Sequence, residues 1–276
     1  MSATLAGKRA AFRRMHESGC FVLPNPWNVG SAMALESLGF KAIASTSAGL
    51  AWSMGRPDNK VGLDLVLNHL TALAGAVDIP LNADFENGFA DDPAGVGANV
   101  ALAVETGVAG LSVEDSTGDA AEPLYDFALA VERIAAARAA IDASGSGVVL
   151  TARSEGFIAG RPDFDETVRR LRAFAAAGAD CLYAPGLSEE SQIAELVRAV
   201  APEPVNVLTL GLPVATLAGL GVRRISVGGS LARAAWGEFL RAAGEISEVG
   251  TFTALAHAEP GGRLNKLFSA RKDGVP

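Results

Sequence analysis

The strongest constraint on the fold is an alternation of short apolar runs with longer helix-forming segments, repeated at intervals of roughly thirty residues. The runs are apolar on both faces, which is typical of a parallel sheet covered on each side. Eight strands are expected, at Phe21–Pro24, Ala42–Ser45, Pro80–Asp84, Gly110–Glu114, Val148–Arg153, Asp180–Ala184, Val205–Thr209 and Arg224–Val227. Eight strand–helix units favour a closed (β/α)8 TIM-type barrel. A doubly wound open sheet is the alternative, but no G-x-G-x-x-G motif follows the first strand.

The segments between the strands are rich in Ala, Leu, Glu and Arg and have helical spacing. They predict helices at Val29–Leu38, Leu63–Ala74, Pro93–Glu105, Phe127–Ala143, Phe164–Ala176, Ser188–Val200, Val214–Ala218 and Leu231–Ile246. A short amphipathic helix at Ala10–His16 is expected to cap the bottom of the barrel. No shift in composition marks a linker, so one barrel domain over residues 1–276 is expected. Residues 251–276 form a C-terminal extension, which we expect to pack on a neighbouring subunit.

The bulk properties exclude several classes of protein. A chain that is 49% apolar and 20% charged should build a sizeable core, and its formal charge of -8 argues against nucleic-acid binding by phosphate neutralisation. Cys20 and Cys181 lie beside apolar residues and are expected to be reduced core thiols. No apolar run reaches the length of a membrane span, and Met1–Gly19 lacks the apolar core of a secretory signal. These features predict a cytoplasmic protein with no membrane or nucleic-acid partner.

Two of the expected strands end in carboxylates. Asp84 and Glu86 follow the third strand, and Glu114 and Asp115 end the fourth. Carboxylates are costly to bury alone, and several at neighbouring strand ends would repel one another. A divalent cation removes both problems: Mg²⁺ needs only one or two protein carboxylates, and Mn²⁺ also accepts oxygen ligands. The pattern predicts an acidic metal site in an enzyme that acts on an anionic substrate; ordinary surface acids after strands are the alternative.

Other candidate residues lie where strands end, which is the active face of a (β/α)8 barrel. Arg153 ends an apolar strand, so its guanidinium should be partly buried and should bind a carboxylate. That carboxylate belongs either to the substrate or, in a purely structural pair, to Glu155 or Glu114. Ser47, Ala48 and Gly49 offer small side chains and backbone N–H groups to an anionic oxygen, unless they form an ordinary glycine turn.

Further candidates carry weaker signals. Asp58 lies in a loop after the second strand, where a surface acid is the alternative, and Trp27 could line the pocket or only pack. Asn206 and Thr209 lie on the seventh strand. Gly228, Gly229 and Ser230 end the eighth strand, where many barrels bind phosphate, although helix packing explains them equally well. His16, His69 and His257 fall on helices or the tail, so none is placed as a general acid or base.

In order and spacing, five segments resemble the isocitrate lyase/phosphoenolpyruvate mutase superfamily. They are Thr46–Leu50, Gly55–Asp58, Ala83–Phe89, Val113–Asp115 and Thr151–Glu155. The resemblance runs from about Phe21 to Val227. It implies a (β/α)8 barrel with a Mg²⁺ site, a reaction that makes or breaks C–C or P–C bonds in 2-oxo or 2-hydroxy acids, and a homo-oligomer. Such oligomers are typically tetramers in which subunits exchange their last helix.

The resemblance also implies roles for individual residues. Asp84 matches the main metal ligand, and Glu86 and Glu114 match ligands that act directly or through water. Ser47, Ala48 and Gly49 resemble the turn that receives the substrate carboxylate and oxyanion, and Arg153 resembles the carboxylate-binding arginine. Asp58 resembles the loop aspartate near the reacting bond, which with Arg153 and Glu114 makes the expected catalytic set. Asn206 is a weaker match to a polar contact from strand seven.

Three departures from the family pattern reduce the number of reactions that we expect. The lyases carry a Lys-Lys-Cys-Gly loop after strand four, whose cysteine donates a proton, but Ser116–Leu124 has no Cys or Lys. The mutases carry an asparagine in that loop and a histidine after strand six, and neither is found here. Glu86 stands where an aspartate is more usual, which lengthens one ligand arm.

The predicted activity is a Mg²⁺-dependent carbon–carbon lyase acting on a small 2-oxo or 2-hydroxy di- or tricarboxylic acid through a pyruvate-like enolate. Oxaloacetate-type decarboxylation or hydrolysis and isocitrate-type cleavage both fit. Decarboxylation suits the missing acid best, because water can protonate the enolate. The alternatives are a phosphoenolpyruvate or phosphonopyruvate mutase or hydrolase and, second, a non-catalytic 2-oxo acid binding protein.

Overall fold

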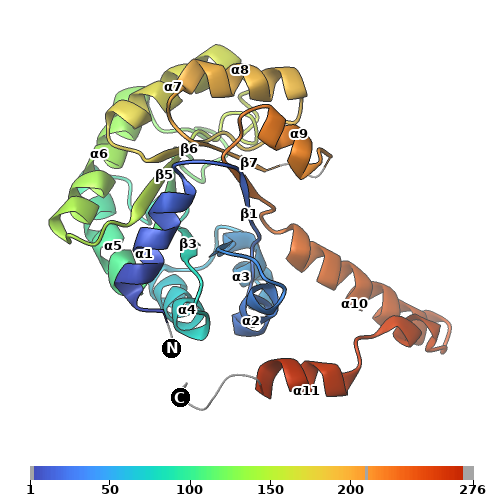
Figure 1. Ribbon diagram of the computed structural model, residues 1–276. Coiled ribbons are helices and arrows are strands. Elements are labelled where there is room, and N and C mark those ends of the chain that lie inside the picture. Colours follow the sequence, from blue (N-terminus) through green and yellow to red (C-terminus); the bar gives the residue numbers. More distant parts are fainter. Residues whose placement is uncertain (1–2, 209–210, 270–276) are drawn as a thin grey trace.

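The computed structural model describes residues 3–208 and 211–269. Its eight strands are parallel and form one sheet in the order β1-β8-β7-β6-β5-β4-β3-β2, curved into a barrel inside a layer of helices (Figure 1). This confirms the TIM-type fold and excludes the doubly wound alternative. The strands are β1 (Phe21–Leu23), β2 (Ile43–Ala44), β3 (Leu81–Asp84), β4 (Gly110–Glu114), β5 (Val149–Arg153), β6 (Cys181–Tyr183), β7 (Val205–Leu208) and β8 (Arg224–Ser226).

The barrel closes between β1 and β2 with fewer contacts than elsewhere. Ala44 N–H donates to the Pro24 carbonyl at 3.0 Å, and the Asn25 side-chain amide donates to the Ser45 carbonyl at 2.9 Å. The register of β4 and β5 places Glu114 directly beside Arg153 at the carboxyl ends of the two strands. Most strands are one or two residues shorter than predicted, and Thr209, predicted to end β7, lies outside the described residues.

The helices agree closely with the sequence prediction, and the bounds of α5 (Pro93–Glu105), α6 (Phe127–Ala143) and α7 (Phe164–Ala176) match it to the residue. Side chains of Asp92 and Asp163 cap α5 and α7 by accepting backbone N–H groups, which explains these sharp starts. The other helices are α1 (Leu5–Met15), α2 (Val29–Ser37), α3 (Ser47–Ser53), α4 (Leu63–Ala76), α8 (Glu190–Val200), α9 (Val214–Gly219), α10 (Ser230–Glu248), the 3-10 helix η1 (Thr253–His257) and α11 (Gly261–Ser269).

Helix α1 covers the amino-terminal end of the barrel, as predicted, but begins earlier, at Leu5. Phe12 is fully buried in a cluster with Leu23 and Val149. The Arg9 side chain donates to the carbonyls of Val104 and Val108, which fixes the helix over the loop before β4. The bottom of the barrel is therefore closed, and ligands must enter from the opposite end.

Helix α10 does not pack back onto the barrel as the earlier helices do. It runs away from the body of the molecule (Figure 1) and buries only Ala232 and Ala242. Helix α11 returns beside α2, where the Phe268 ring approaches Gly30. We name residues 230–269 the C-terminal arm; the predicted extension beyond 269 lies outside the described residues.

The two cysteines differ in burial. Cys181 is buried in the core as expected, whereas Cys20 is only half-buried, because it lies in the loop before β1 rather than within a strand. No helix in residues 3–208 or 211–269 is both long and apolar enough to cross a membrane.

Candidate active site

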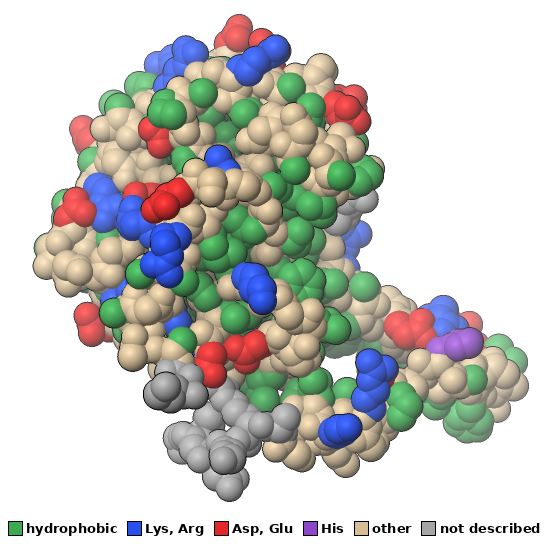
Figure 2. Space-filling view, in the orientation of Figure 1, with side chains coloured by type: hydrophobic (Ala, Val, Ile, Leu, Met, Phe, Trp, Pro, Cys, Tyr) green, Lys and Arg blue, Asp and Glu red, His purple; other side chains and the backbone are tan. Residues whose placement is uncertain are grey.

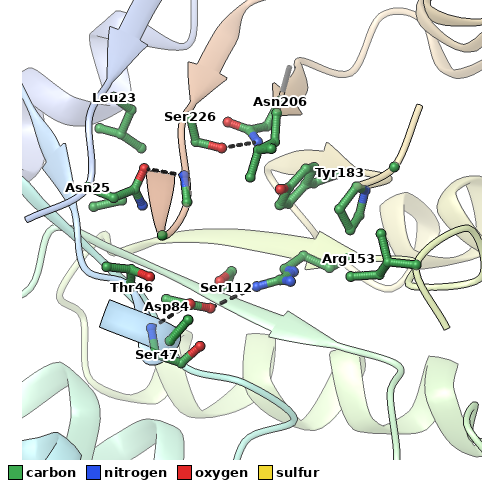
Figure 3. Close-up of a pocket in the computed structure, with 18 of the residues that line it drawn as sticks. Leu23, Asn25, Thr46, Ser47, Asp84, Ser112, Arg153, Tyr183, Asn206 and Ser226 are labelled. Atoms are coloured by element: carbon green, nitrogen blue, oxygen red, sulfur yellow. Dashed lines mark hydrogen bonds and ion pairs between the residues drawn. The ribbon is translucent and has the colours of Figure 1, made fainter. Parts of the chain in front are cut away.

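A cavity of about 600 Å³ opens at the carboxyl ends of the strands. Six of the predicted site residues line it: Ser47, Ala48, Asp58, Asp84, Arg153 and Asn206. Figure 3 shows Asp84 and Arg153 on one side of this cavity and Asn206 with Ser226 on the other. Residues from β2, β3, β5, β7 and β8 thus meet at the face that the fold makes available for a ligand.

Asp84, at the end of β3, is held by groups from three elements. Its Oδ2 accepts the Ser47 N–H at 2.9 Å, and its Oδ1 accepts Arg153 Nη1 at 2.7 Å. Its own N–H donates to the Ser45 hydroxyl at 2.8 Å. The carboxylate is fixed in position, and each oxygen keeps a second lone pair for another partner.

Arg153 is surrounded by carboxylates. Glu155 accepts from Nε at 2.8 Å and from Nη2 at 3.2 Å, while Nη2 also lies 3.1 Å from Glu114 and Nη1 contacts Asp84. Burial opposes the charge on Arg153, but these carboxylates outweigh it and raise its pKa well above the ordinary value. The ion pair of Arg153 with Glu155 or Glu114, expected as the alternative to a substrate carboxylate, is therefore present. Glu155 is the bidentate partner. Among the described residues Nη1 donates only to Asp84, so one of its N–H groups is available to a ligand.

Glu86 and Glu114 lie behind this pair and line a smaller cavity of about 220 Å³ rather than the main one. Burial, with the charges of Asp84 and Asp58, raises the pKa of Glu86 to about 8. Burial also raises the pKa of Glu114 well above its usual range, although Arg153 opposes this. The backbone of Glu86 has a φ of 46°, a region that costs a non-glycine residue roughly 1–3 kcal/mol.

Asp58 lies on the exposed loop between α3 and α4 and reaches the edge of the main cavity. It accepts a hydrogen bond from the Asn59 N–H at 2.9 Å and another from the Ser47 hydroxyl. Partial burial, with the nearby Asp84 carboxylate, raises its pKa. The loop thus brings a second carboxyl group to the mouth of the cavity, as predicted.

The segment from Ser47 to Gly49 is not a glycine turn but the first turn of α3, which the sequence analysis missed. Its N–H groups are mostly occupied, since Ser47 donates to Asp84 and Gly49 donates to Thr46 Oγ1 at 3.3 Å. Ala48 N–H makes no hydrogen bond to a described residue. Gly49 faces Trp27 and Thr46 instead of the cavity, because α3 packs closely there.

Four residues with weaker sequence signals have different positions relative to the main cavity. Trp27 does not line the main cavity; it lines a separate hollow with Trp236 and Phe239. Gly228 and Gly229 do line the main cavity, and Asn25 Oδ1 accepts the Gly228 N–H at 2.9 Å. Ser230 begins α10.

Asp115, the second carboxylate at the end of β4, has a structural position. Its Oδ1 accepts the Glu155 N–H at 2.8 Å and its Oδ2 contacts Arg170 at 3.1 Å, so it ties β4 to β5 and α7. The loop that follows folds back on itself as Ser116 pairs with Leu124, and it presents Ser116 and Thr117 to the smaller cavity. It brings no thiol or amine to the site.

The charges around the site decide whether a divalent cation suits it. Asp84 raises the pKa of Asp58, Glu86 and Glu114, and Arg153 is the cation among these carboxylates. Among the described residues, no three His, Cys, Asp or Glu side chains already converge as a finished metal cluster. Mg²⁺ needs only one or two carboxylates and keeps several waters. The donor set therefore suits a hydrated hard cation rather than a site closed by protein ligands.

A polar lining inside the barrel was not predicted from the sequence. Asn82, Ser112, Tyr183, Arg224 and Ser226 all line the main cavity from within strands. Tyr183 ends β6 with the Arg153 guanidinium 5.2 Å from its ring centroid. The signal was available, because alternate residues of these strands are polar where a filled barrel would carry Val, Ile or Leu.

Comparison with known proteins places this geometry in a family. Residues 12–247 match the sequence model described as phosphoenolpyruvate phosphomutase. An uncharacterized Mycobacterium tuberculosis protein is 35% identical over 79% of this chain and 81% of its own length. An oxaloacetate decarboxylase of Paraburkholderia xenovorans is 30% identical, covering 80% of this chain and 76% of the relative.

Solved structures of lyase-type and hydrolase proteins are also similar to this chain. A Burkholderia cenocepacia protein described provisionally as a lyase or mutase is 47% identical, with a TM-score of 0.94 and 98% of both chains covered. A phosphonopyruvate hydrolase, solved with oxalate and Mg²⁺, is 27% identical, with a TM-score of 0.85 and 95% of both chains covered.

Proposed function

Since the chain belongs to the isocitrate lyase/phosphoenolpyruvate mutase superfamily and is an enzyme of its lyase type, we propose that it cleaves a carbon–carbon bond in a small 2-oxo or 2-hydroxy di- or tricarboxylic acid. Mg²⁺ is the proposed cofactor, and Mn²⁺ is its natural substitute. Decarboxylation or hydrolysis of an oxaloacetate-like acid is the reaction that we favour, with isocitrate-type cleavage as a variant.

The observation that carries this proposal is the position of Asp84 and Arg153 at the wall of the main cavity. Asp84, with Glu86 and Glu114 behind it, would hold the metal directly or through water. When bound, the metal would stabilise negative charge on the oxygen of an enolate, which is usually the largest catalytic contribution. The second N–H of Arg153 Nη1 and the Ala48 N–H would donate hydrogen bonds to substrate oxygens. Ser47 and Asn206 would also contact the substrate.

The missing proton donor decides between reactions. In decarboxylation the bond to the carboxylate breaks, CO₂ leaves, and the electron pair remains as an enolate that water protonates. Ser116–Leu124 supplies no cysteine or lysine as a proton donor for this step, and a decarboxylation can take its proton from water instead. Asp58 is the proposed catalytic carboxyl group at the mouth of the cavity, positioned to order a water molecule near the reacting bond.

A phosphonopyruvate-type reaction is the second candidate, favoured by Gly228 and Gly229, which bring backbone to the cavity where many barrels bind phosphate. Phosphorus NMR of phosphonopyruvate incubated with the enzyme and Mg²⁺ separates the two candidates. A shift of the phosphonate signal to phosphate or phosphoenolpyruvate would assign the chain to the second. A third outcome, stabilisation by 2-oxo acids with no turnover of any, would identify a binding protein instead.

Substitution Asp84→Ala tests the metal site. We expect it to lower kcat/KM by roughly 100-fold or more and to abolish the thermal stabilisation by oxalate that requires Mg²⁺. Asp119→Ala, which removes an exposed carboxylate from the loop after β4, is the matched control and should change neither. Full activity of Asp84→Ala, or of metal-free enzyme, would refute the proposal.

We also propose that the enzyme is a homo-oligomer, either a dimer or a tetramer. The support is the C-terminal arm, which leaves the barrel and exposes large apolar side chains (Figure 2). Such a surface is unusual on a monomer and marks an interaction site.

A further inference from the structure

Arg224 is a buried cation for which the proposed function has not accounted. It begins β8, is only 2% exposed, and lines the main cavity from below. Burial, with a smaller contribution from the charge of Arg153, lowers its pKa, as expected for a charge taken out of water. A guanidinium in this position is expected to have an anionic partner, because an unpaired buried charge is costly.

No such partner is found among the described residues. Nε donates to Asn206 Oδ1 at 2.8 Å, and Nη1 lies 3.3 Å from His16 Nε2 and 3.4 Å from Asn82 Oδ1. All three acceptors are neutral, and no carboxylate lies within 4.0 Å of this side chain in the described part of the chain. The Nη2 group donates to no described residue, so its two N–H groups are available to a ligand in the cavity.

The other buried arginines show how this chain normally satisfies such a group. Arg153 has three carboxylates and Arg170 has two. Arg133 has none, but it donates to the carbonyls of Asn87, Ala90 and Asp91 and stacks on Tyr125. Arg224 has neither carboxylate partners nor a set of backbone carbonyls among the described residues. Arg133 and Arg224 both lack a carboxylate, and of these two arginines only Arg224 lines the main cavity.

The position of Arg224 relative to the proposed metal site follows from β3. Its Nη1 approaches Asn82, which lies two residues before Asp84 on the same strand, or roughly 7 Å along it. The guanidinium therefore lies one layer below the Asp84–Arg153 pair. A ligand that reaches both layers must carry anionic groups at both ends.

The side chains around Arg224 hold it in that position. Asn206 accepts from Arg224 through Oδ1, so its amide group is turned to donate to the Ser226 hydroxyl at 3.0 Å. Ser226 in turn shares a hydrogen bond with Tyr183. Figure 3 shows Asn206, Ser226 and Tyr183 together across the cavity from Asp84. This polar chain leaves the guanidinium as the charged group at the lower end of the cavity.

We propose that Arg224 binds the distal carboxylate of the substrate and so selects dicarboxylic over monocarboxylic acids. The inference rests on the proposed function, because it assumes that the first carboxylate and the 2-oxygen of the acid sit beside Asp84. A charge-assisted hydrogen bond in a buried site corresponds to roughly 10- to 100-fold in affinity, which sets the expected selectivity.

A matched pair of ligands tests it. Malate and 2-hydroxybutyrate share a four-carbon 2-hydroxy acid skeleton and differ only in the distal group, a carboxylate or a methyl. With Mg²⁺ present, dissociation constants from titration calorimetry should favour malate by about 10- to 100-fold in the natural chain. In Arg224→Gln that preference should disappear. Arg223→Gln is the control, because the neighbouring arginine bonds the Gly19 carbonyl at the surface and should keep the preference.

Oxalate separates failure of this inference from failure of the proposed function, because it is too short to reach Arg224. Mg²⁺-dependent binding of oxalate to Arg224→Gln shows that the variant is folded and that the metal site is intact. If the variant does not fold, Arg224→Lys retains a charge and should keep part of the preference for malate. Equal binding of both acids by the natural chain, or a preference that survives in Arg224→Gln, would overturn the inference. If neither oxalate nor malate binds the natural chain with Mg²⁺, the proposed function fails and the inference fails with it.

Discussion

His16 illustrates at the residue scale how the closed end of the barrel depends on one protonation state. Its Nδ1–H donates to the Phe12 carbonyl at 2.8 Å, and its Nε2 faces Arg224 Nη1 at 3.3 Å. Only the neutral ring can present a lone pair to that guanidinium. Burial first, then Arg224, Arg13 and Arg223, lower the pKa of His16 to about 3, against the opposing hydrogen bond to Phe12.

A pH dependence of stability follows. In the unfolded chain His16 takes up a proton near its ordinary pKa of about 6.5, whereas the folded chain resists until about pH 3. The contribution to the free energy of unfolding is therefore intact above pH 6.5 and is lost progressively as the pH falls towards 3. Between pH 6.5 and pH 5 we expect a loss of about 2 kcal/mol from this residue.

Urea unfolding of the natural chain and of His16→Gln at several pH values measures this contribution. The glutamine keeps an acceptor for Arg224 but does not titrate, so its stability should fall less on acidification. His69, whose pKa burial lowers to about 4, and the buried carboxyl groups contribute equally to both proteins and cancel in the difference. His257→Gln, on the exposed arm, should behave like the natural chain. Identical pH profiles for His16→Gln and the natural chain would contradict the assignment.

Single residues also mark where sequence reasoning succeeded and failed. Asp84 and Arg153 could be predicted because a charged residue that ends an apolar strand has few alternative positions in a barrel. The polar alternation of β8 is visible in the sequence, but the burial of Arg224 could not be predicted from it, because this residue begins its strand, where a charge is ordinarily solvated. Here α1 covers that end of the barrel, so the side chain is directed inward.

Helix α3 shows the corresponding limit at the scale of elements. Longer helices such as α7 repeat their apolar positions over several turns, so their bounds could be predicted to the residue. Seven residues with two alanines and a glycine give no such repeat. The helix forms because Thr46 caps it and because Gly49 allows it to approach Trp27 closely.

Gly49→Ala is expected to disturb the site through this helix. A Cβ atom there would lie 2.6 Å from Thr46 Cγ2 and 2.8 Å from Trp27 Cβ, so α3 must shift. We expect a loss of about 1–3 kcal/mol in the free energy of unfolding and weaker Mg²⁺-dependent binding of oxalate, since Ser47 moves with the helix. Denaturant unfolding and titration calorimetry measure the two effects.

The control is Gly75→Ala in α4, where an added Cβ meets nothing within 4 Å. That substitution should stabilise the chain by roughly 0.5–1 kcal/mol, because alanine favours the helix, and should leave oxalate binding unchanged. A harmless Gly49→Ala would show that α3 tolerates displacement and that close packing does not position Ser47.

At the scale of the whole molecule, the barrel could be predicted from its repeat, whereas the course of the C-terminal arm could not. The apolar pattern of α10 indicates which side chains need covering, but not which molecule covers them. In the structure Phe239, Leu240, Val249 and Phe252 are 59%, 62%, 69% and 65% exposed, respectively. The eighth strand–helix unit thus leaves its own barrel with an apolar face that needs a partner.

A second copy of the chain is the partner that symmetry favours, because two arms can then cover each other's exposed faces in a closed assembly. Sedimentation of the full chain at micromolar concentration should show a dimer or tetramer. Replacing Phe239 and Leu240 together with aspartate should weaken association by at least about tenfold, since apolar anchors dominate such interfaces. Leu102→Asp, at a 50% exposed leucine on α5, should not. A natural chain that sediments as a monomer would mean that the arm serves another partner, and the proposed homo-oligomer would be wrong.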